Sequence, residues 1–190
     1  MVNEQFNILK LLVENQETEF SIRQISKIRK INYKSAYNVI QKLTEQGVIN
    51  VKKLGNNNSC SFNHNFNELV FNVEYARKNK LIKKNKDFAI ICEDLSNINN
   101  QFIAIIFGSY AKGKATKNSD IDLLIITDNI KPIQQKLSLL PLNIHVTDIN
   151  YSDFMQMLKS KENTVVSEVI KKNIILNGIE DYYRLIKNAK

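Results

Sequence analysis

The chain has 190 residues, 43% of them hydrophobic and 24% charged, which is the balance of a soluble globular protein with one or two domains. Its 27 Lys and Arg against 19 acidic residues give a formal net charge of +8, which favours polyanionic partners such as nucleic acid or nucleotide phosphates. No apolar run approaches the roughly 18 residues that a membrane helix needs, and the N-terminus lacks the layout of a signal peptide. We therefore expect a cytoplasmic protein without a membrane segment.

The first third of the chain carries three helical patterns in succession. Apolar residues at helical spacing predict a helix from Glu4 to Asn15. A shorter helix over residues 21–28 follows, with Ser21 suited to cap its N-terminus. A third helix is predicted over residues 32–47, where Gly47 stands at a position that favours glycine after a helix.

Two strand patterns follow these helices. Residues 48–54 and 59–63 are predicted to form short strands, and the stretch from Gly55 to Asn58 between them has strong turn chemistry. Helix, short helix, longer helix and hairpin, in this order, are the plan of a winged helix-turn-helix. The stretch YKSAYNVIQKLTEQGVINVKK resembles that family, and the resemblance implies a winged helix-turn-helix domain over residues 1–65.

The winged-helix resemblance implies an interface for DNA. In that fold the third helix enters the major groove and the wing touches the DNA backbone, and residues 1–65 hold nine Lys and Arg against five acidic residues. Winged helices also serve as protein-docking modules and are often dimers, so we expect DNA binding and a homodimer, with protein docking as the alternative. The residues expected to face DNA are Tyr33, Lys34, Ser35, Tyr37, Asn38, Gln41 and Lys42 on the helix and Lys52 and Lys53 on the wing.

The remainder of the chain alternates between strand and helix patterns. Residues 66–100 are predicted to form connecting helices, and residues 101–190 a second domain. Strands first and helices later are typical of an α+β fold. Strands are predicted at 102–107, 121–127 and 142–149, and helices at 134–140, 152–159, 165–176 and 180–186.

The stretch GSYAKGKATKNSDIDL, residues 108–123, lies between two of these strands. Gly108 allows close approach of a ligand to the backbone, and Ser109 with free N–H groups at a helix start suits phosphate oxygens. Asp120 and Asp122 are two residues apart on an extended chain, so both carboxylates project to one face. Two carboxylates beside a phosphate site form an oxygen-only site suited to Mg²⁺.

The same stretch resembles the signature of the DNA polymerase β-type nucleotidyltransferase superfamily, in its minimal nucleotidyltransferase branch. Gly-Ser, Ala-x-Gly and Ser-Asp-x-Asp-Leu are all present, while Lys112 stands where the family usually has arginine. The resemblance implies a polymerase β-like mixed sheet with flanking helices. It implies that the phosphates lie against Gly108, Ser109, Lys112 and Ser119, and that Asp120 and Asp122 ligate Mg²⁺.

The superfamily normally adds a third acid on the next strand, as general base and metal ligand. If Ile144 and Val146 face the core, alternation directs Asn143, His145 and Thr147 toward the site. Asp148 then projects to the opposite face, away from the site, unless a bulge or the end of the strand changes its direction. Three alternatives stay open: Asp148 reaches in, His145 replaces the acid, or the third function is absent.

These features together predict a Mg²⁺-dependent enzyme that moves a nucleoside monophosphate from an NTP, with ATP expected, to an acceptor hydroxyl. Relatives in the minimal branch modify partner proteins, often HEPN-type toxins, so such a partner is one expectation. The alternative is a DNA-binding transcriptional regulator with a degenerate, nucleotide-sensing nucleotidyltransferase fold. A third alternative is an antitoxin that neutralises its partner by docking alone.

Overall fold

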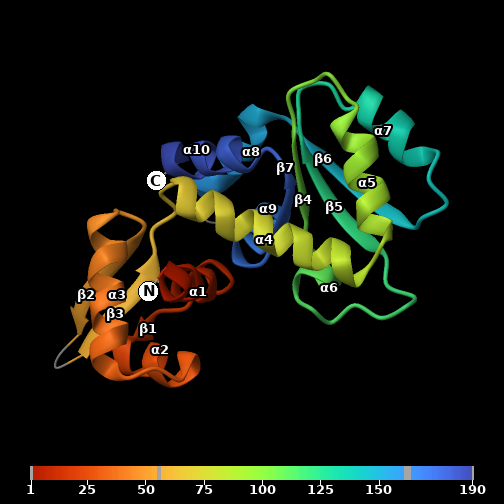
Figure 1. The fold of residues 1–190 in the computed structure, drawn as a ribbon. Helices are drawn as coiled ribbons and strands as arrows, with labels where there is room; N and C mark the ends of the chain where they lie inside the picture. Colours follow the sequence, from red (N-terminus) through yellow and green to blue (C-terminus); the bar gives the residue numbers. More distant parts are fainter. Residues whose placement is uncertain (1, 55–56, 161–163, 190) are drawn as a thin grey trace. The chain divides into compact units, whose positions relative to one another are not determined.

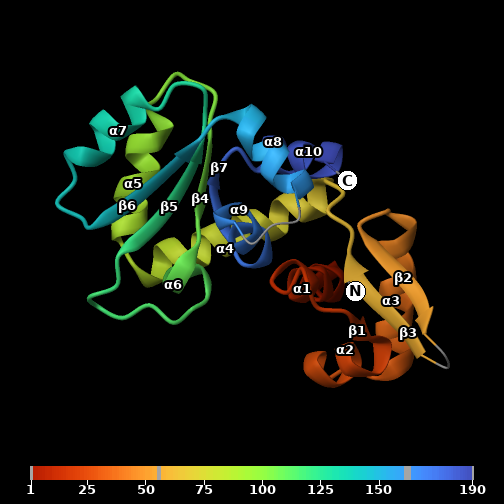
Figure 2. The ribbon, with the colours of Figure 1, turned by 180° about the vertical axis from the view of Figure 1, so that it is seen from behind.

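The computed structural model describes residues 2–54, 57–160 and 164–189, and Figures 1 and 2 show them from opposite sides. The chain forms two compact units, residues 1–73 and 74–190. The boundary falls within one helix, α4 (Glu68–Lys84). None of the described helices combines the length and apolarity needed to cross a bilayer.

The first unit contains three helices and a three-stranded antiparallel sheet of order β1-β3-β2. The three predicted helices and the predicted hairpin strands are confirmed, whereas the two-residue strand β1 is too short to leave a periodic pattern. Of the turn predicted over residues 55–58, Gly55 and Asn56 lie outside the described residues, whereas Asn57 and Asn58 belong to β3 and pair with β2. The elements are α1 (Val2–Val13), β1 (Phe20–Ser21), α2 (Ile22–Arg29), α3 (Tyr33–Glu45), β2 (Ile49–Leu54) and β3 (Asn57–Phe62).

Local hydrogen bonds fix the ends of α2 and α3. Ser21 caps α2 in a reciprocal arrangement, because its hydroxyl accepts from the N–H of Gln24 while the Gln24 side chain accepts from the N–H of Ser21. Gly47 follows α3 with φ +68°. Its N–H donates to Thr44, and that of Val48 donates to Leu43, the pattern that ends many helices at a left-handed glycine.

The second unit is a mixed four-stranded sheet of order β6-β5-β4-β7 with helices on both faces. Strand β5 is antiparallel to β4 and parallel to β6, and β7 is antiparallel to β4. This mixed α+β architecture agrees with the predicted fold class. After α4 the elements are α5 (Asp87–Ser96), β4 (Ile103–Ile106), α6 (Gly108–Ala111), β5 (Ile121–Ile126), α7 (Lys131–Ser138), β6 (Ile144–Ile149), α8 (Tyr151–Ser160), α9 (Val165–Lys171), β7 (Ile174–Asn177) and α10 (Ile179–Ala189).

Alternation along β5 assigns its side chains to the two faces of the sheet. Ile121, Leu123 and Ile125 belong to a buried core that includes Phe88 of α5 and Ile133 of α7. Asp122 and Leu124 therefore project to the opposite face, which α8, α9 and α10 cover in Figures 1 and 2. The carboxylate of Asp122 consequently lies on the face away from α5 and α7.

The predicted helix over residues 165–176 is wrong in its last part. Helix α9 ends at Lys171, and Lys172 is already extended. The Asn173 side chain donates to the carbonyl of Val169, so a side chain occupies an acceptor near the helix end. Ile174–Asn177 instead pairs with β4 at the sheet edge, because a short apolar run fits a buried strand as well as a helix and only the neighbouring strand decides.

A buried polar network, which the sequence analysis missed, joins α4, β7 and α10. Arg77 donates to Glu74 at 2.5 Å and also to the carbonyl of Asn173. Tyr183 donates its hydroxyl proton to the other Glu74 oxygen at 2.5 Å, and Asn173 donates to the Tyr182 hydroxyl at 3.1 Å. Burial and then the Glu74 carboxylate raise the pKa of Tyr183 well above its usual range, so this hydroxyl remains a donor.

Candidate functional site

The turn after β4 brings the glycine of the motif next to the second aspartate. Helix α6 begins at Gly108 directly after Phe107, as predicted, and the N–H of Phe107 donates to the carbonyl of Asp122 at 3.1 Å. Gly108 has φ +62°, and a Cβ built on it would lie 1.9 Å from Oδ2 of Asp122. Only glycine therefore fits this position, both for its backbone conformation and for the space that the carboxylate needs.

We expect Gly108→Ala to weaken binding of ATP, the nucleotide proposed below as the donor, by at least about 10-fold. The added Cβ would displace the Asp122 carboxylate, and a 1 Å displacement of a site group costs on the order of 10²-fold in activity. The measurement is calorimetric titration of the full chain with ATP and Mg²⁺. Gly113→Ala is the matched control: Gly113 also has positive φ (+69°), but its Cβ would meet nothing within 4 Å. Equal losses in both variants would show that backbone strain, and not the Asp122 contact, causes the effect.

Asp120 and Asp122 lie beside two polar residues of the neighbouring strand. The β5–β6 ladder pairs Ile121 with Ile144 and Asp122 with His145, so Asn143 stands next to Asp120. The Asn143 side-chain amide donates to Oδ1 of Asp120, and Nδ1 of His145 lies 3.7 Å from Oδ1 of Asp122. We call Asp120, Asp122, Asn143 and His145 the carboxylate cluster.

Asn143 is the residue of this cluster that was not among the predicted site residues. Its backbone carbonyl accepts from the N–H of Ile121 at 2.9 Å, which fixes the start of the two strands together. The signal for it was already in the sequence, since alternation from Ile144 and Val146 directs residues 143 and 145 to the same face. An amide rather than a carboxylate therefore contacts Asp120.

The structure does not bring Asp148 to the carboxylate cluster. The ladder runs from Ile121–Ile144 to Ile126–Ile149 without a shift and pairs Asp148 with Ile125. Asp148 lies three positions beyond His145, so its side chain projects to the same face of the sheet as the core residues of β5 and to the opposite face from His145. Within this fully described ladder no bulge turns the Asp148 side chain toward the cluster. The register therefore favours His145, the alternative to Asp148, as the third residue of the site.

The other predicted phosphate-binding residues occupy the loop around α6. Ser109 is half-buried in the first turn of α6. Lys112 forms an exposed ion pair with Glu168 of α9. Ser119 braces the turn before β5, since its hydroxyl accepts from the N–H of Thr116 at 2.8 Å. Lys112 and Ser119 therefore have protein partners, while Gly108 is in direct contact with the cluster.

The carboxylate cluster fits a divalent cation held partly by a substrate. Mg²⁺ sites that act on nucleotides commonly use one or two carboxylates, with phosphate oxygens and water completing the shell. Asp120 and Asp122 supply two carboxylates on one face, and the absence of a Cβ on Gly108 leaves room at Asp122 Oδ2. Among the described residues no three His, Cys, Asp or Glu side chains form a ready-made metal cage.

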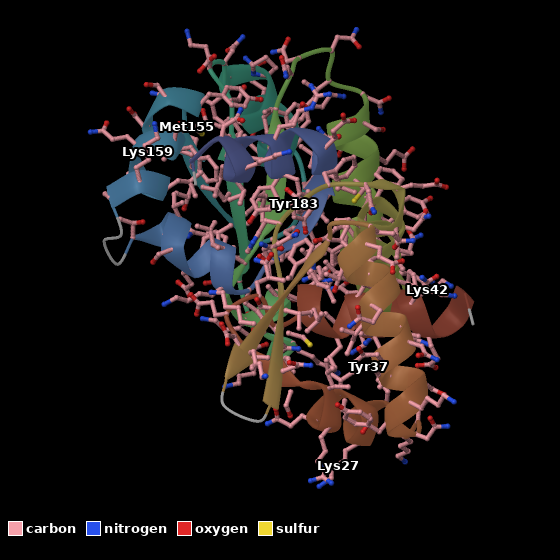
Figure 3. The ribbon with its side chains drawn as sticks, turned by 90° about the vertical axis from the view of Figure 1, so that its left-hand side faces the viewer. Lys27, Tyr37, Lys42, Met155, Lys159 and Tyr183 are labelled. Atoms are coloured by element: carbon pink, nitrogen blue, oxygen red, sulfur yellow. The ribbon has the colours of Figure 1, made fainter. Side chains whose placement is uncertain are left out.

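The α3 residues predicted to face DNA lie outside its buried stripe of Ala36, Val39, Ile40 and Leu43, and Lys52 and Lys53 lie on β2. Tyr33 and Tyr37 are 52% and 40% exposed and stack with centroids 6.5 Å apart. Figure 3 shows Lys27 on α2, with its amine pointing away from the ribbon, and Tyr37 and Lys42 on α3. Gln41 is half-buried, whereas the remaining predicted residues are exposed: Lys34, Ser35, Asn38, Lys42, Lys52 and Lys53.

A basic hollow of about 450 Å³ adjoins this surface. It is lined by Arg23, Lys27, Tyr33 and Asn58, among others. Cationic and hydroxyl side chains around a concave surface suit phosphate oxygens. Tyr33 belongs both to the exposed face of α3 and to the lining of this hollow.

Comparison with known proteins finds one family model that is similar to part of the chain. Residues 91–181 match the family model described as "Polymerase beta, Nucleotidyltransferase". A solved structure, described as "Crystal structure of the toxin-antitoxin with AMP-PNP", is similar at 24% sequence identity and a TM-score of 0.35, covering 59% of this chain and 82% of that one. No curated protein matches the chain. Residues 91–181 are thus similar to the nucleotidyltransferase domain that this family model describes.

Proposed function

We propose that this nucleotidyltransferase domain is an active, Mg²⁺-dependent enzyme that transfers a nucleoside monophosphate from an NTP, with ATP as the expected donor, to a hydroxyl group. The observation that supports this most is the contact of Gly108 with the Asp122 carboxylate, which places a loop suited to phosphates against a group suited to a metal. Gly108 and Ser109 would hold the triphosphate. Asp120 and Asp122 would hold the cation.

Each residue of the cluster has a distinct task in this proposal. Asp120 and Asp122 would hold a Mg²⁺ ion, which would supply charge neutralisation for the triphosphate and for the leaving pyrophosphate. Asn143 orients Asp120 through its amide hydrogen bond. His145 accepts the proton of the acceptor hydroxyl, a task within the range of an imidazole near neutral pH. The hydroxyl oxygen then forms a bond to the α-phosphorus as the bond to pyrophosphate breaks.

Calorimetry with ATP and Mg²⁺ tests the proposal directly. The native chain is expected to bind the nucleotide only with the cation present, and the double variant Asp120→Ala/Asp122→Ala is expected to lose this dependence on the cation. Labelled ATP then tests release of pyrophosphate. A native chain that binds neither ATP nor the cation would refute the proposal.

For the first unit we propose a winged helix-turn-helix that binds DNA through α3, with the β2–β3 hairpin as the wing. The exposed tyrosines, amides and lysines of α3 and the basic hollow beside it support this proposal. Positioning contacts to phosphates and base contacts in the major groove both use such side chains. The unit would bring the enzyme to a DNA site or control transcription.

Removing two lysines from this surface is expected to weaken DNA binding and its dependence on salt. For Lys34→Ala/Lys42→Ala we expect the slope of log K against log salt to fall in magnitude by about 1.8, because each lost phosphate contact removes about 0.9. Fluorescence anisotropy of duplex DNA at several salt concentrations measures the slope. Lys83→Ala/Lys84→Ala, two exposed lysines of α4, removes the same charge elsewhere. An unchanged slope in the α3 variant would exclude α3 as the interface.

A DNA-binding regulator that senses nucleotide without transferring it is the second candidate function. The observation that favours it is the amide of Asn143 beside Asp120, together with the position of Asp148 away from the cluster. It predicts nucleotide binding without pyrophosphate release, and a DNA affinity that changes when nucleotide is added. Pyrophosphate release by the native chain would reject this candidate.

A further inference from the structure

A cavity of about 620 Å³ lies at the carboxyl ends of β5 and β6, between these strands and helices α8 and α9. Its volume falls within the range of small-molecule sites. Its apolar lining residues are Leu124, Ile130, Ile149, Met157, Val165 and Val166, and its exposed acids are Asp128, Asp148 and Asp153. None of the described residues that line it is Lys, Arg or His.

This cavity shares a sheet face with the carboxylate cluster. Leu124 pairs with Thr147 two positions after Asp122 pairs with His145. Residues two apart on a strand project to the same face about 7 Å from each other. The wall of the cavity formed by Leu124 and Thr147 is therefore one side-chain row away from the groups that we assign to nucleotidyl transfer, while Asp128 lies at the far end of the cavity, six residues beyond Asp122 in the chain.

The charge of the cavity excludes a polyanion and suits a cation. Asp153 accepts from the Asn150 side chain at 2.8 Å, and Asp128 accepts from the N–H of Tyr151 at 3.5 Å. Both of these hydrogen-bond partners are neutral groups. A triphosphate would be repelled here, whereas an ammonium or guanidinium group would be attracted.

We propose that this cavity binds the acceptor, and that the acceptor is a hydroxyl compound with an apolar portion and an ammonium or guanidinium group. The proposal rests on the proposed nucleotidyl transfer and adds the chemical class of its second substrate. The apolar lining contacts the acceptor frame, and the two aspartates attract its cation. The acceptor hydroxyl oxygen forms the new bond to the α-phosphorus, its proton passes to His145, and pyrophosphate leaves with the electron pair of the broken bond.

Binding of defined probes to the full chain tests this proposal. The capped tripeptide Arg-Ser-Leu represents a protein acceptor, glucosamine a free amino sugar, and capped Glu-Ser-Leu is the charge-reversed control. Calorimetry with each probe is run beside calorimetry with ATP and Mg²⁺. We expect binding of at least one cationic probe, none of the anionic one, and an increase in affinity at low salt.

Two variants locate the binding. Asp128→Asn/Asp153→Asn is expected to weaken binding of the cationic probe about five-fold or more, because each exposed charge pair contributes up to about five-fold in affinity. Val165→Trp, at a half-exposed rim position, is expected to block the cavity and abolish probe binding. Both variants should bind ATP with Mg²⁺ like the native chain. The control variant Glu93→Gln/Asp94→Asn on α5 changes the net charge by the same amount, and we expect it to bind the probe and ATP like the native chain.

Each other result overturns the proposal in an identifiable way. If neither cationic probe binds the native chain, or if Val165→Trp leaves probe binding intact, the cavity is not the acceptor site. If the cavity variants lose binding of ATP but keep binding of the probe, the cavity holds the nucleoside of ATP and not the acceptor. If the probes bind but ATP and Mg²⁺ do not, the proposed transfer reaction fails, and the acceptor role fails with it.

Discussion

Asp122→Asn lowers the rate of nucleotidyl transfer by about 10³-fold, the loss expected when a preorganised charge at a reacting phosphate is removed. Asp122 contributes more than its own charge. Its carboxylate fills the space beside Gly108, and its backbone carbonyl accepts from Phe107 at the start of the loop. The asparagine keeps the shape of the side chain and removes the negative charge, so the loss reports on electrostatics rather than on packing. Pyrophosphate release at saturating ATP and Mg²⁺ measures it.

Asp148→Asn is the matched control for this variant, because it makes the same chemical change on the neighbouring strand. Asp148 pairs with Ile125 and projects to the opposite face from Asp122, but it also lines the cavity that we propose for the acceptor. We therefore expect the rate of Asp148→Asn at saturating acceptor to stay within about two-fold of the native one, as for surface substitutions in general. His145→Ala should lower the rate about 10²-fold, the size of a lost general base. The reverse ranking, with Asp148 essential and His145 dispensable, would contradict the assignment that the ladder register supports.

Arg77→Met lowers the free energy of unfolding of the second unit by about 3–5 kcal/mol, because it leaves the Glu74 carboxylate buried without its cation. Glu74 is 0% exposed and Arg77 5%, so water cannot replace the lost partner. Methionine keeps the length and apolar volume of the arginine stem, which limits the effect of an empty space. Urea denaturation with hydrogen exchange at the β4 and β5 amides measures the change within residues 74–190.

Arg184→Met tests whether burial causes this effect. Arg184 pairs with Glu180 on α10 at 2.7 Å, with side chains 69% and 54% exposed, and exposed pairs contribute at most about 1 kcal/mol. The double variant Glu74→Leu/Arg77→Met removes both charges and should recover part of the stability, since apolar replacements of buried pairs are often neutral. The recovery is incomplete because the Tyr183 hydroxyl and the Asn173 carbonyl lose their partners. Similar losses in Arg77→Met and Arg184→Met would mean that the network does not stabilise the fold.

The sequence by itself determined the helices, most of the strands and the central motif. Local signals sufficed where the interactions are local: Ser21 caps the helix that follows it, and Gly47 ends α3 through bonds to Thr44 and Leu43. The projection of Asp120 and Asp122 to one face follows from strand geometry alone, because side chains alternate along any extended chain, whichever strand pairs with it. The same rule marked Asn143 and His145 as residues facing the site.

Only the tertiary structure decided what depends on neighbours distant in the chain. Residues 174–177 form β7 because β4 offers an edge to pair with, and an apolar run does not encode that edge. The parallel register of β5 and β6 separates Asp148 from the cluster and sets His145 beside Asp122. Gly108 proved necessary because Asp122, fourteen residues away, fills the space of its missing side chain. These choices depend on packing between distant segments, and packing is a property of the folded chain rather than of any short stretch of it.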